Sequence, residues 1–344
     1  MKNSRSIIVG ISGLILNKNE ISILKRYLPL GIILFSRNIK DKYQLVQLVN
    51  QIKGLLGNNC LILIDQEGGR VQRLKQPNCP NYPAVEIYGK LAIKSIKIAK
   101  RAVYLNYYLL GSDLIDIGIN VNCAPCLDVI SEYTHSVIGN RSFSKDPNIV
   151  SLLGKMACNG LMDSGVLPII KHIPGHGRAS SDSHLSLPVV KEKIEFLENS
   201  DFIPFRVLSK MPIAMTAHIL YKDIDAKWPI TQSKIANNYI KKKLNYRGIL
   251  ISDDIEMSAL SGDTKSKIES IYNAGYDIIL HCSGIAKDTE VALKYGKIID
   301  NNVLKKLELS CDKIQKINNL SYLPSYKIEL SDILKKYLDY NLSL

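Results

Sequence analysis

Short, continuously apolar runs alternate with longer amphipathic stretches along most of the chain. The amphipathic stretches have the spacing of helices, and the apolar runs are typical of strands covered on both faces of a parallel sheet. The predicted strands lie at 6–13, 31–36, 60–65, 120–128, 167–172, 213–218, 248–253 and 276–281. The predicted helices lie at 41–55, 85–117, 147–164, 192–209, 233–244 and 266–274, and another helix-like segment begins at Asn19.

Eight strands alternating with helices predict an α/β fold of the TIM-type (β/α)8 barrel. A doubly wound sheet is the alternative, but no Gly-x-Gly-x-x-Gly follows the first strand and no switch point is evident. The barrel is expected over about 6–285, and terminal helices, centred on 300–318 and 327–342, over about 286–344. Because no Pro-, Gly- or Ser-rich linker divides the chain, residues 1–344 are expected to form a single domain.

The composition is that of a globular protein, since 46% of the 344 residues are hydrophobic and 22% are charged. It excludes disordered, coiled-coil and collagen-like chains. The 45 Lys and Arg against 32 Asp and Glu give a net charge of +13. Because the excess is mostly scattered lysine, we interpret it as a solvated surface and expect no nucleic-acid partner.

Seven cysteines, an odd number without a framework of spacings, favour a reducing compartment. Cys123 and Cys126 have the spacing of a redox or zinc pair, but no second pair accompanies them. The apolar N-terminal run lacks a small-residue cleavage site, so it predicts a first strand and not a signal peptide. No apolar stretch approaches the ~18 residues needed to span a bilayer. We therefore expect a cytoplasmic protein without membrane contact.

Polar residues follow the predicted strands repeatedly, at the end of a barrel where catalytic groups collect. They are Asp65-Gln-Glu-Gly-Gly-Arg-Val-Gln-Arg73, Asp128 with Arg141, Lys171-His-Ile-Pro-Gly-His-Gly177, Thr216-Ala-His218 and Ser252-Asp-Asp254. Acids, arginines and a lysine gathered in this way suit a polyhydroxylated ligand. On the residues alone, the pattern predicts a hydrolase or lyase acting on a carbohydrate-like substrate.

Residues 171–184 hold three of the six histidines. His172 and His176 have the spacing of a helical metal site, but Pro174 and Gly175 forbid that helix. The glycines lack the Gly-Lys-Ser/Thr ending of a phosphate-binding loop. Asp182 stands two residues before His184, where a carboxylate can orient an imidazole that acts first as a general acid and then as a base.

Asp253 and Asp254 end a buried strand, which holds a carboxylate rigidly, as a nucleophile requires. The alternative is that one of them caps the following helix, since Asp is a strong N-cap residue. Two adjacent carboxylates allow both roles, and the residues alone leave the choice open.

At these positions the sequence resembles the β-N-acetylglucosaminidases of glycoside hydrolase family 3, the single-domain bacterial type that trims peptidoglycan fragments. The resemblance covers about 10–284. It includes Gly31-Ile-Ile-Leu-Phe-Ser-Arg-Asn38, Asp65-Gln-Glu-Gly-Gly-Arg-Val-Gln-Arg-Leu74, Ala124-Pro-Cys-Leu-Asp-Val129, Ile138-Gly-Asn-Arg-Ser-Phe143, 171–184 with Leu187-Pro188, Met215-Thr-Ala-His218 and Ser252-Asp-Asp-Ile-Glu-Met257.

The resemblance implies a barrel in which Asp253 is the nucleophile, His184 the acid/base and Asp182 its partner. Asp254 becomes a supporting or capping residue. The residues implied in sugar binding are Asp65, Arg73, Arg141, Lys171 and His172. No metal or organic cofactor is implied, and His176 is interpreted as loop scaffolding.

The chain departs from the family pattern at two places. Arg178-Ala179 stands where one common form has Asp-Thr, and Ile255-Glu256 replaces a frequent Leu-Ser. The first change leaves the chemistry intact but bears on loop mobility and contacts beyond the first sugar.

The function implied is a retaining exo-β-N-acetylglucosaminidase, a monomer acting on terminal β-linked N-acetylglucosamine of peptidoglycan-derived, muropeptide-type fragments. It would work through a covalent glycosyl-enzyme on Asp253. The alternatives are a β-N-acetylglucosaminide phosphorylase, because a neutral histidine does not repel phosphate, and a non-enzymatic sugar-binding barrel.

Overall fold

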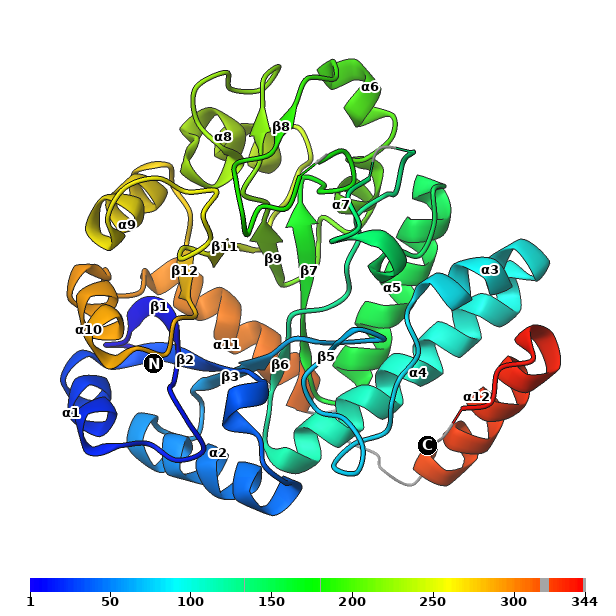
Figure 1. The fold of residues 1–344 in the computed structure, drawn as a ribbon, viewed down its shortest axis with the longest axis horizontal. Helices are drawn as coiled ribbons and strands as arrows, with labels where there is room; N and C mark the ends of the chain where they lie inside the picture. The colour runs from blue at the N-terminus through cyan, green and yellow to red at the C-terminus, as the bar shows by residue number, and fades with distance from the viewer. Residues whose placement is uncertain (133, 180, 316–321, 343–344) are drawn as a thin grey trace.

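Eight parallel strands close into a barrel in the computed structural model, which describes residues 1–132, 134–179, 181–315 and 322–342 (Figure 1). Around the barrel the order is β1-β12-β11-β9-β7-β6-β3-β2. The barrel strands are β1 (Arg5–Gly10), β2 (Pro29–Leu34), β3 (Leu61–Ile64), β6 (Val121–Asn122), β7 (Leu167–Ile173), β9 (Ile213–Thr216), β11 (Ile249–Asp254) and β12 (Ile278–His281). The predicted TIM-type barrel is confirmed, and all eight predicted strands are present.

Most of the helices follow the strands and form the outer ring, whereas α11 (Asn301–Gln315) lies across one end of the barrel (Figure 1). The helices are α1 (Lys18–Tyr27), α2 (Lys42–Leu56), α3 (Glu86–Lys94), α4 (Ile96–Ile117), α5 (Pro147–Asp163), α6 (Ile194–Glu198), α7 (Ile203–Val207), α8 (Lys234–Lys242), α9 (Thr264–Asn273), α10 (Ala286–Tyr295), α11 and α12 (Leu323–Leu338). Short elements in the loops are β4 (Gln66–Gly68), β5 (Val71–Gln72), β8 (Val189–Val190), β10 (Leu220–Tyr221), η1 (Ser36–Asn38), η2 (Gly139–Arg141) and η3 (Ile230–Gln232).

Two predicted helices are divided in the structure. The stretch 85–117 breaks at Ser95, which adopts an extended backbone and caps α4 by accepting a hydrogen bond from the N–H of Ile98. Helical periodicity continues across the break, so only the capping residue marks it. The stretch 192–209 becomes two single-turn helices, and Pro204 lies in the first turn of the second, where its missing N–H has no intrahelical role.

The fourth strand is much shorter than the predicted 120–128. Pro125 has no N–H to donate, and the regular ladder of β6 ends at Asn122. Beyond Asn122, Cys126 forms an isolated β-bridge with Lys171 of β7. The carbonyl of Lys171 also accepts a hydrogen bond from the N–H of Leu127. Asp128 is therefore held against β7 by a loop, next to the polar end of that strand.

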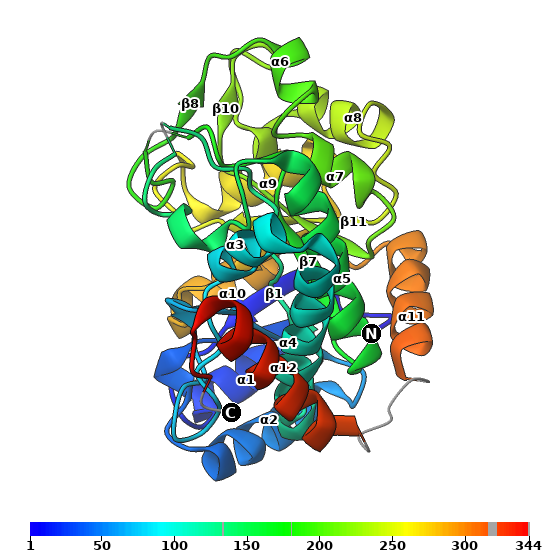
Figure 2. The ribbon, with the colours of Figure 1, turned by 90° about the vertical axis from the view of Figure 1, so that its right-hand side faces the viewer.

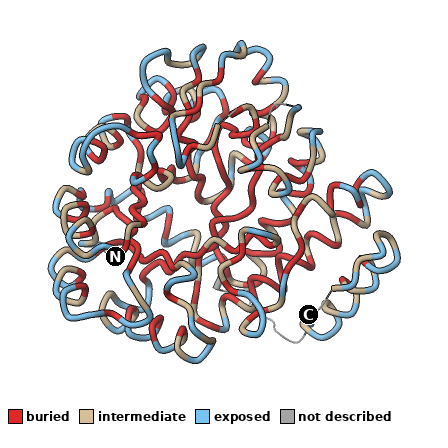
Figure 3. The backbone as a smooth tube through the Cα atoms, viewed as in Figure 1, coloured by how far each residue is buried: buried red, intermediate tan, exposed pale blue. Residues whose placement is uncertain are grey.

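Apolar side chains fill the barrel and the layer between the strands and their helices. Figure 3 shows that the buried residues gather in the barrel strands and on the helices around them. Inside the barrel, Ile8, Leu63 and Ile251 belong to one buried cluster. Leu304 and Leu307 of α11 join that cluster and close the amino-terminal end of the barrel, on the side away from β8 and β10 (Figure 2). The opposite, carboxyl-terminal end therefore stays free for polar groups. Helix α12 packs against α3 and α4.

The helix predicted at 300–318 corresponds to α11, which covers 301–315. Residues 316–318 of that prediction lie outside the described residues. Helix 327–342 corresponds to α12, which begins four residues earlier. None of the helices in the described ranges is both long enough and apolar enough to cross a membrane.

Candidate functional site

A cavity of about 240 Å³ opens at the carboxyl-terminal end of the barrel. The predicted site residues that line it are Asp65, Arg73, Arg141, Lys171, His172, His184 and Asp253. They lie at or beyond the ends of four barrel strands, β3, β6, β7 and β11, so closure of the barrel brings together residues that are up to 188 positions apart in the sequence. Asp182 does not line the cavity, but it contacts His184.

Lys171 lies at the centre of the charged network. Its side chain is 3% exposed, and its Nζ lies 2.8 Å from Asp65 Oδ1 and 2.7 Å from Glu67 Oε1. The other oxygen of Asp65 accepts a hydrogen bond from Arg73 NH2 at 3.1 Å. One ammonium thus holds both carboxylates at the end of β3 in place.

Glu67 also binds Arg141, and it was not among the predicted site residues. Its two oxygens accept hydrogen bonds from Arg141 Nε at 2.9 Å and from NH2 at 2.8 Å, a bidentate pair that fixes the guanidinium plane. Glu67 does not line the cavity itself. Its position two residues after Asp65 could have indicated that it belongs to the site, because alternate residues of an extended segment face the same side.

The network keeps its members charged at neutral pH. Burial alone raises the pKa of both carboxyl groups, but Lys171 and Arg73 hold the pKa of Asp65 below its usual range. In the same way, Arg141 and Lys171 outweigh burial and lower the pKa of Glu67 to about 2. Burial lowers the pKa of Lys171, but the two carboxylates raise it above its usual value. The cavity therefore presents fixed charges and hydrogen-bond groups.

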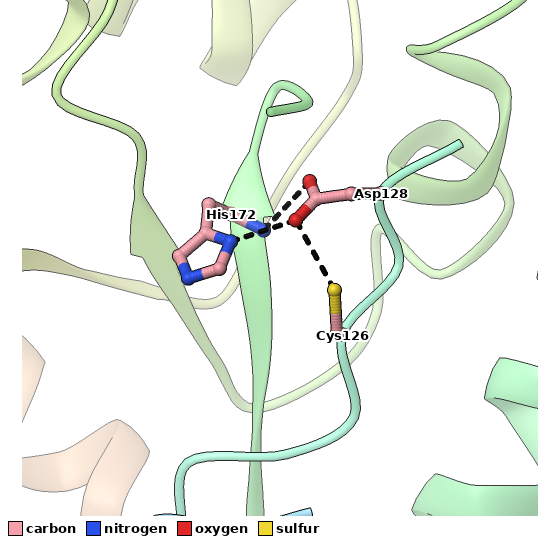
Figure 4. A group of neighbouring side chains, drawn as sticks. All are labelled: Cys126, Asp128 and His172. Carbon is pink, nitrogen blue, oxygen red and sulfur yellow. Dashed lines mark hydrogen bonds and ion pairs between the residues drawn. The ribbon is translucent and has the colours of Figure 1, made fainter. Parts of the chain in front are cut away.

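His172 is oriented by Asp128 from the loop after β6. Its Nδ1 lies 2.7 Å from Asp128 Oδ2 (Figure 4). Burial raises the pKa of Asp128, but His172 outweighs this effect and holds it below the usual range. Because the Asp128 carboxylate accepts a hydrogen bond from Nδ1 of His172, the other ring nitrogen, Nε2, is left to contact a ligand.

Cys126, Asp128 and His172 offer three ligand atoms within 4.8 Å of one another. Two contacts at Asp128 have hydrogen-bond geometry, because Cys126 Sγ donates to Oδ2 at 3.1 Å and the N–H of His176 donates to Oδ1 at 2.7 Å. Burial raises the pKa of the Cys126 thiol, which fits its role as the donor of this hydrogen bond. We interpret the group as a hydrogen-bonded support for His172 (Figure 4).

His184 lies on the long loop after β7, and its side chain is 63% exposed. Its Nδ1 lies 2.8 Å from Asp182 Oδ1, which also accepts the backbone N–H of His184 at 2.9 Å. Burial raises the pKa of Asp182, but these contacts with His184 outweigh it and lower the pKa. The predicted pair is therefore present as a contact, with the imidazole facing the cavity from an open loop.

Two contacts hold the ends of this loop. His176 Nε2 lies 3.1 Å from Ser183 Oγ, which fits the expected scaffolding role. Arg178, at one of the departures from the family pattern, donates from Nε to Asp201 Oδ2 at 2.9 Å and lies over the ring of Phe196. The other departure places Glu256 3.4 Å from Nε2 of the buried His281. Ser180, within the loop, lies outside the described residues.

Asp253 and Asp254 at the end of β11 both line the cavity but differ electrostatically. Burial raises the pKa of Asp253, but the surrounding groups, His172 foremost, outweigh burial and lower that pKa. Burial raises the pKa of Asp254 to about 6, although its Oδ1 accepts the N–H groups of Glu256 and Cys282. Asp253 is thus the more strongly ionised of the two, and Asp254 ties its loop to β12.

The cavity rim includes residues that the sequence did not single out. Arg70 lines the cavity, and its guanidinium donates to the backbone carbonyls of Ser136 and Val137. Phe35 lines it too, and Arg73 lies over its ring. Arg70 stands inside the Asp65–Arg73 motif, but its partners are backbone atoms that no sequence pattern specifies.

Comparison with known proteins places the chain in a family. Residues 8–316 match the model of the glycosyl hydrolase family 3 N terminal domain. The chain belongs to glycoside hydrolase family 3. The prediction of this family, and of a glycoside hydrolase, is confirmed.

Named family 3 relatives support this assignment. The beta-hexosaminidase of Bordetella parapertussis is 33% identical over 282 residues, covering 80% of this chain and 79% of that protein. The beta-hexosaminidase of Psychromonas ingrahamii is 34% identical over 285 residues, covering 81% and 83%. NagZ from Neisseria gonorrhoeae, solved in complex with N-trifluoroacetyl-D-glucosamine, has a TM-score of 0.86 at 28% identity and covers 96% of this chain and 98% of its own.

Replacing Glu67 tests the charged network of this family 3 barrel. Glu67→Gln removes the carboxylate paired with Arg141 and one of the two paired with Lys171, and it should lower the free energy of unfolding at pH 7 by about 3 kcal/mol. The folded-state pKa of Glu67, about 2, lies below the unfolded value of about 4.3. Its contribution is therefore present above about pH 4.3 and lost as the pH falls through about 2.

Urea unfolding of both proteins between pH 7 and pH 3 measures this difference. The difference in the free energy of unfolding between wild type and Glu67→Gln should become smaller as the pH falls. Glu86→Gln is the matched control, because Glu86 pairs with Lys90 on an exposed helix surface, where such pairs contribute little. A gap of the same size at every pH would show that the charge of Glu67 contributes nothing.

Proposed function

We propose that the protein is a retaining exo-β-N-acetylglucosaminidase that removes terminal β-linked N-acetylglucosamine from peptidoglycan-derived fragments. One observation carries the proposal: an ionised strand-end carboxylate, Asp253, and a loop imidazole, His184, face one small polar cavity. That is the pairing of nucleophile and proton donor needed for two-step glycoside cleavage.

The size of the cavity supports exo action on one sugar unit. Its volume of about 240 Å³ is below the roughly 300–1,000 Å³ of pockets that take drug-sized ligands. The fixed charges of Asp65, Arg73, Arg141 and Lys171 provide directional hydrogen bonds to sugar hydroxyls, and His172 adds an imidazole nitrogen. The related NagZ structure with N-trifluoroacetyl-D-glucosamine supports an N-acetylglucosamine unit as the ligand.

In the first step, Asp253 attacks the anomeric carbon as the bond to the leaving oxygen breaks. His184 gives that oxygen a proton from Nε2, because Nδ1 donates to Asp182. The transition state is oxocarbenium-like, and the product is a covalent glycosyl-enzyme. In the second step His184 takes a proton from water, which attacks the same carbon and frees Asp253 with retained configuration.

The fragment beyond the first sugar meets the loop that carries His184 and the rim that includes Arg70. A cation at the rim and a net charge of +13 favour an anionic aglycone such as a muropeptide. All the proposed catalytic residues come from one chain, so a monomer suffices. The seven cysteines are unpaired, which supports a reducing, cytoplasmic setting.

Replacing the nucleophile is the first test. Asp253→Asn should lower kcat on an aryl N-acetylglucosaminide by several orders of magnitude with an unchanged Tm, because an amide cannot form the ester intermediate. Asp254→Asn is the matched control, since an amide oxygen can still accept the two N–H bonds made by Asp254 Oδ1. A larger loss in Asp254→Asn than in Asp253→Asn would exchange the two roles.

Replacing His184 tests the acid/base assignment. His184→Ala should impair cleavage of a natural disaccharide far more than cleavage of a nitrophenyl glycoside, because protonation matters most for a poor leaving group. Azide should partly restore turnover of the nitrophenyl substrate, since it needs no base. Asp182→Asn should give a smaller loss and shift the pH profile of kcat/KM. Equal losses on both substrates without azide rescue would assign the proton to another residue.

Analysis of the products with and without inorganic phosphate separates hydrolysis from phosphorolysis. Hydrolysis predicts free N-acetylglucosamine of retained configuration by NMR under both conditions, with turnover unaffected by phosphate. Accumulation of the sugar 1-phosphate, with a rate that rises with phosphate, would establish a phosphorylase. Absence of turnover on every β-N-acetylglucosaminide tried would favour a sugar-binding barrel.

A further inference from the structure

The segment that carries Asp253 lies beyond the regular ladder between its strand and β9. Pairing of β11 with β9 runs from Ile249 to Ile251 and ends at the partner Met215. On the other side, pairing of β11 with β12 is irregular between Ile251 and Asp254. The carboxylate of Asp253 therefore depends on contacts other than the sheet for its position.

On the β12 side, side chains provide these contacts. Ser252 Oγ accepts the backbone N–H of Leu280 at 3.0 Å, and Asp254 Oδ1 accepts that of Cys282 at 3.0 Å. These two bonds flank Asp253 and add to the backbone pairing of Asp254 with Leu280, where the N–H of Ile255 donates to the carbonyl of Leu280 at 3.0 Å.

On the β9 side, the imidazole of His218 spans the gap. His218 lies two residues beyond the end of β9 and is fully buried. Its Nε2 lies 3.0 Å from the backbone carbonyl oxygen of Asp254. A carbonyl only accepts, so Nε2 carries the hydrogen. His218 does not line the cavity, and its effect on the reaction must pass through the backbone next to Asp253.

Two buried threonine hydroxyls fix which nitrogen of His218 carries that hydrogen. Nδ1 lies 2.8 Å from Thr231 Oγ1, which lies 2.9 Å from Thr216 Oγ1. With a neutral ring, Thr231 donates to Nδ1 and accepts from Thr216. Thr231 Oγ1 also lies 3.1 Å from the carbonyl of Ala217, but donation there would require an imidazolium. Burial lowers the pKa of His218, which favours the neutral ring.

We infer that His218 is a positioning residue that sets the place of Asp253 by donating its Nε2–H to the carbonyl of Asp254. The Thr216–Thr231 hydroxyl pair holds its ring in the required tautomer. The inference rests on the proposed role of Asp253 as the nucleophile. It deepens that proposal by naming what holds the nucleophile on the side where the sheet ends.

Replacements of His218 that differ only in reach test the inference. The amide nitrogen of Gln occupies the place of Nε2, whereas that of Asn occupies the place of Nδ1 and cannot reach Asp254. His218→Phe and His218→Asn should each lower kcat by on the order of 100-fold, the loss typical of a reacting group displaced by about 1 Å. His218→Gln should recover much of that loss.

Three readouts separate positioning from a structural role. The inhibition constant of N-acetylglucosamine should stay at the wild-type value, because the sugar-binding residues are untouched. The loss should be equal on good and poor leaving groups, unlike that of His184→Ala, since the nucleophile is needed for both. His281→Phe removes another fully buried imidazole, one that contacts Glu256 at 3.4 Å and makes no bond to the backbone beside Asp253, and it should leave kcat close to wild type.

Thr231→Val provides a second route if His218→Phe does not fold. It removes the hydroxyl beside Nδ1 without a change of shape, and it should lower kcat in the wild-type background but not in His218→Asn, because it acts through the ring. Wild-type kcat in Thr231→Val or in a folded His218→Phe, or equal losses in His218→Gln and His218→Asn, would overturn the inference. An active Asp253→Asn would instead overturn the proposed function beneath it.

Discussion

The arrangement of the cavity depends on the contact of one buried ammonium, that of Lys171, with two carboxylates, Asp65 and Glu67. A buried charge without a partner is very costly, and each of these groups is stable only because the others are there. Lys171 lies near the end of β7 and the carboxylates follow β3, and the short β6 lies between these two strands. The contact exists only when the barrel has closed, so folding and assembly of the site are one event.

The charged network and the proposed catalytic pair are held in different ways. Asp253 lies on a strand end bracketed by Ser252 and Asp254 on one side and His218 on the other. His184 lies on a loop with its side chain 63% exposed, and its partner Asp182 lies on the same loop. A proposed nucleophile held on a strand end, beside a proposed proton donor on a loop, suits a site that must admit the sugar before the imidazole can act on it.

Much of the fold could be predicted from the sequence, because a buried strand leaves a continuous apolar run and an amphipathic helix leaves a periodic pattern of apolar residues. Because polar residues at the carboxyl ends of barrel strands meet at one opening, the sequence also predicts that Asp65, Lys171 and Asp253 lie together. The end of β6 at Asn122 was missed because apolar character continues through 120–128, although Pro125 cannot extend a ladder. Glu67 was missed because a residue that acts through other side chains has no motif of its own.

A crystal structure of the enzyme after reaction with a fluorinated N-acetylglucosaminide that accumulates the glycosyl-enzyme tests the account most directly. The account predicts a covalent bond between the anomeric carbon and Asp253, with the sugar hydroxyls in contact with Asp65, Arg73, Arg141 and Lys171 and with the Glu67 contacts intact. A sugar bonded to Asp254 or to any other residue, or bound outside this cavity, would contradict it.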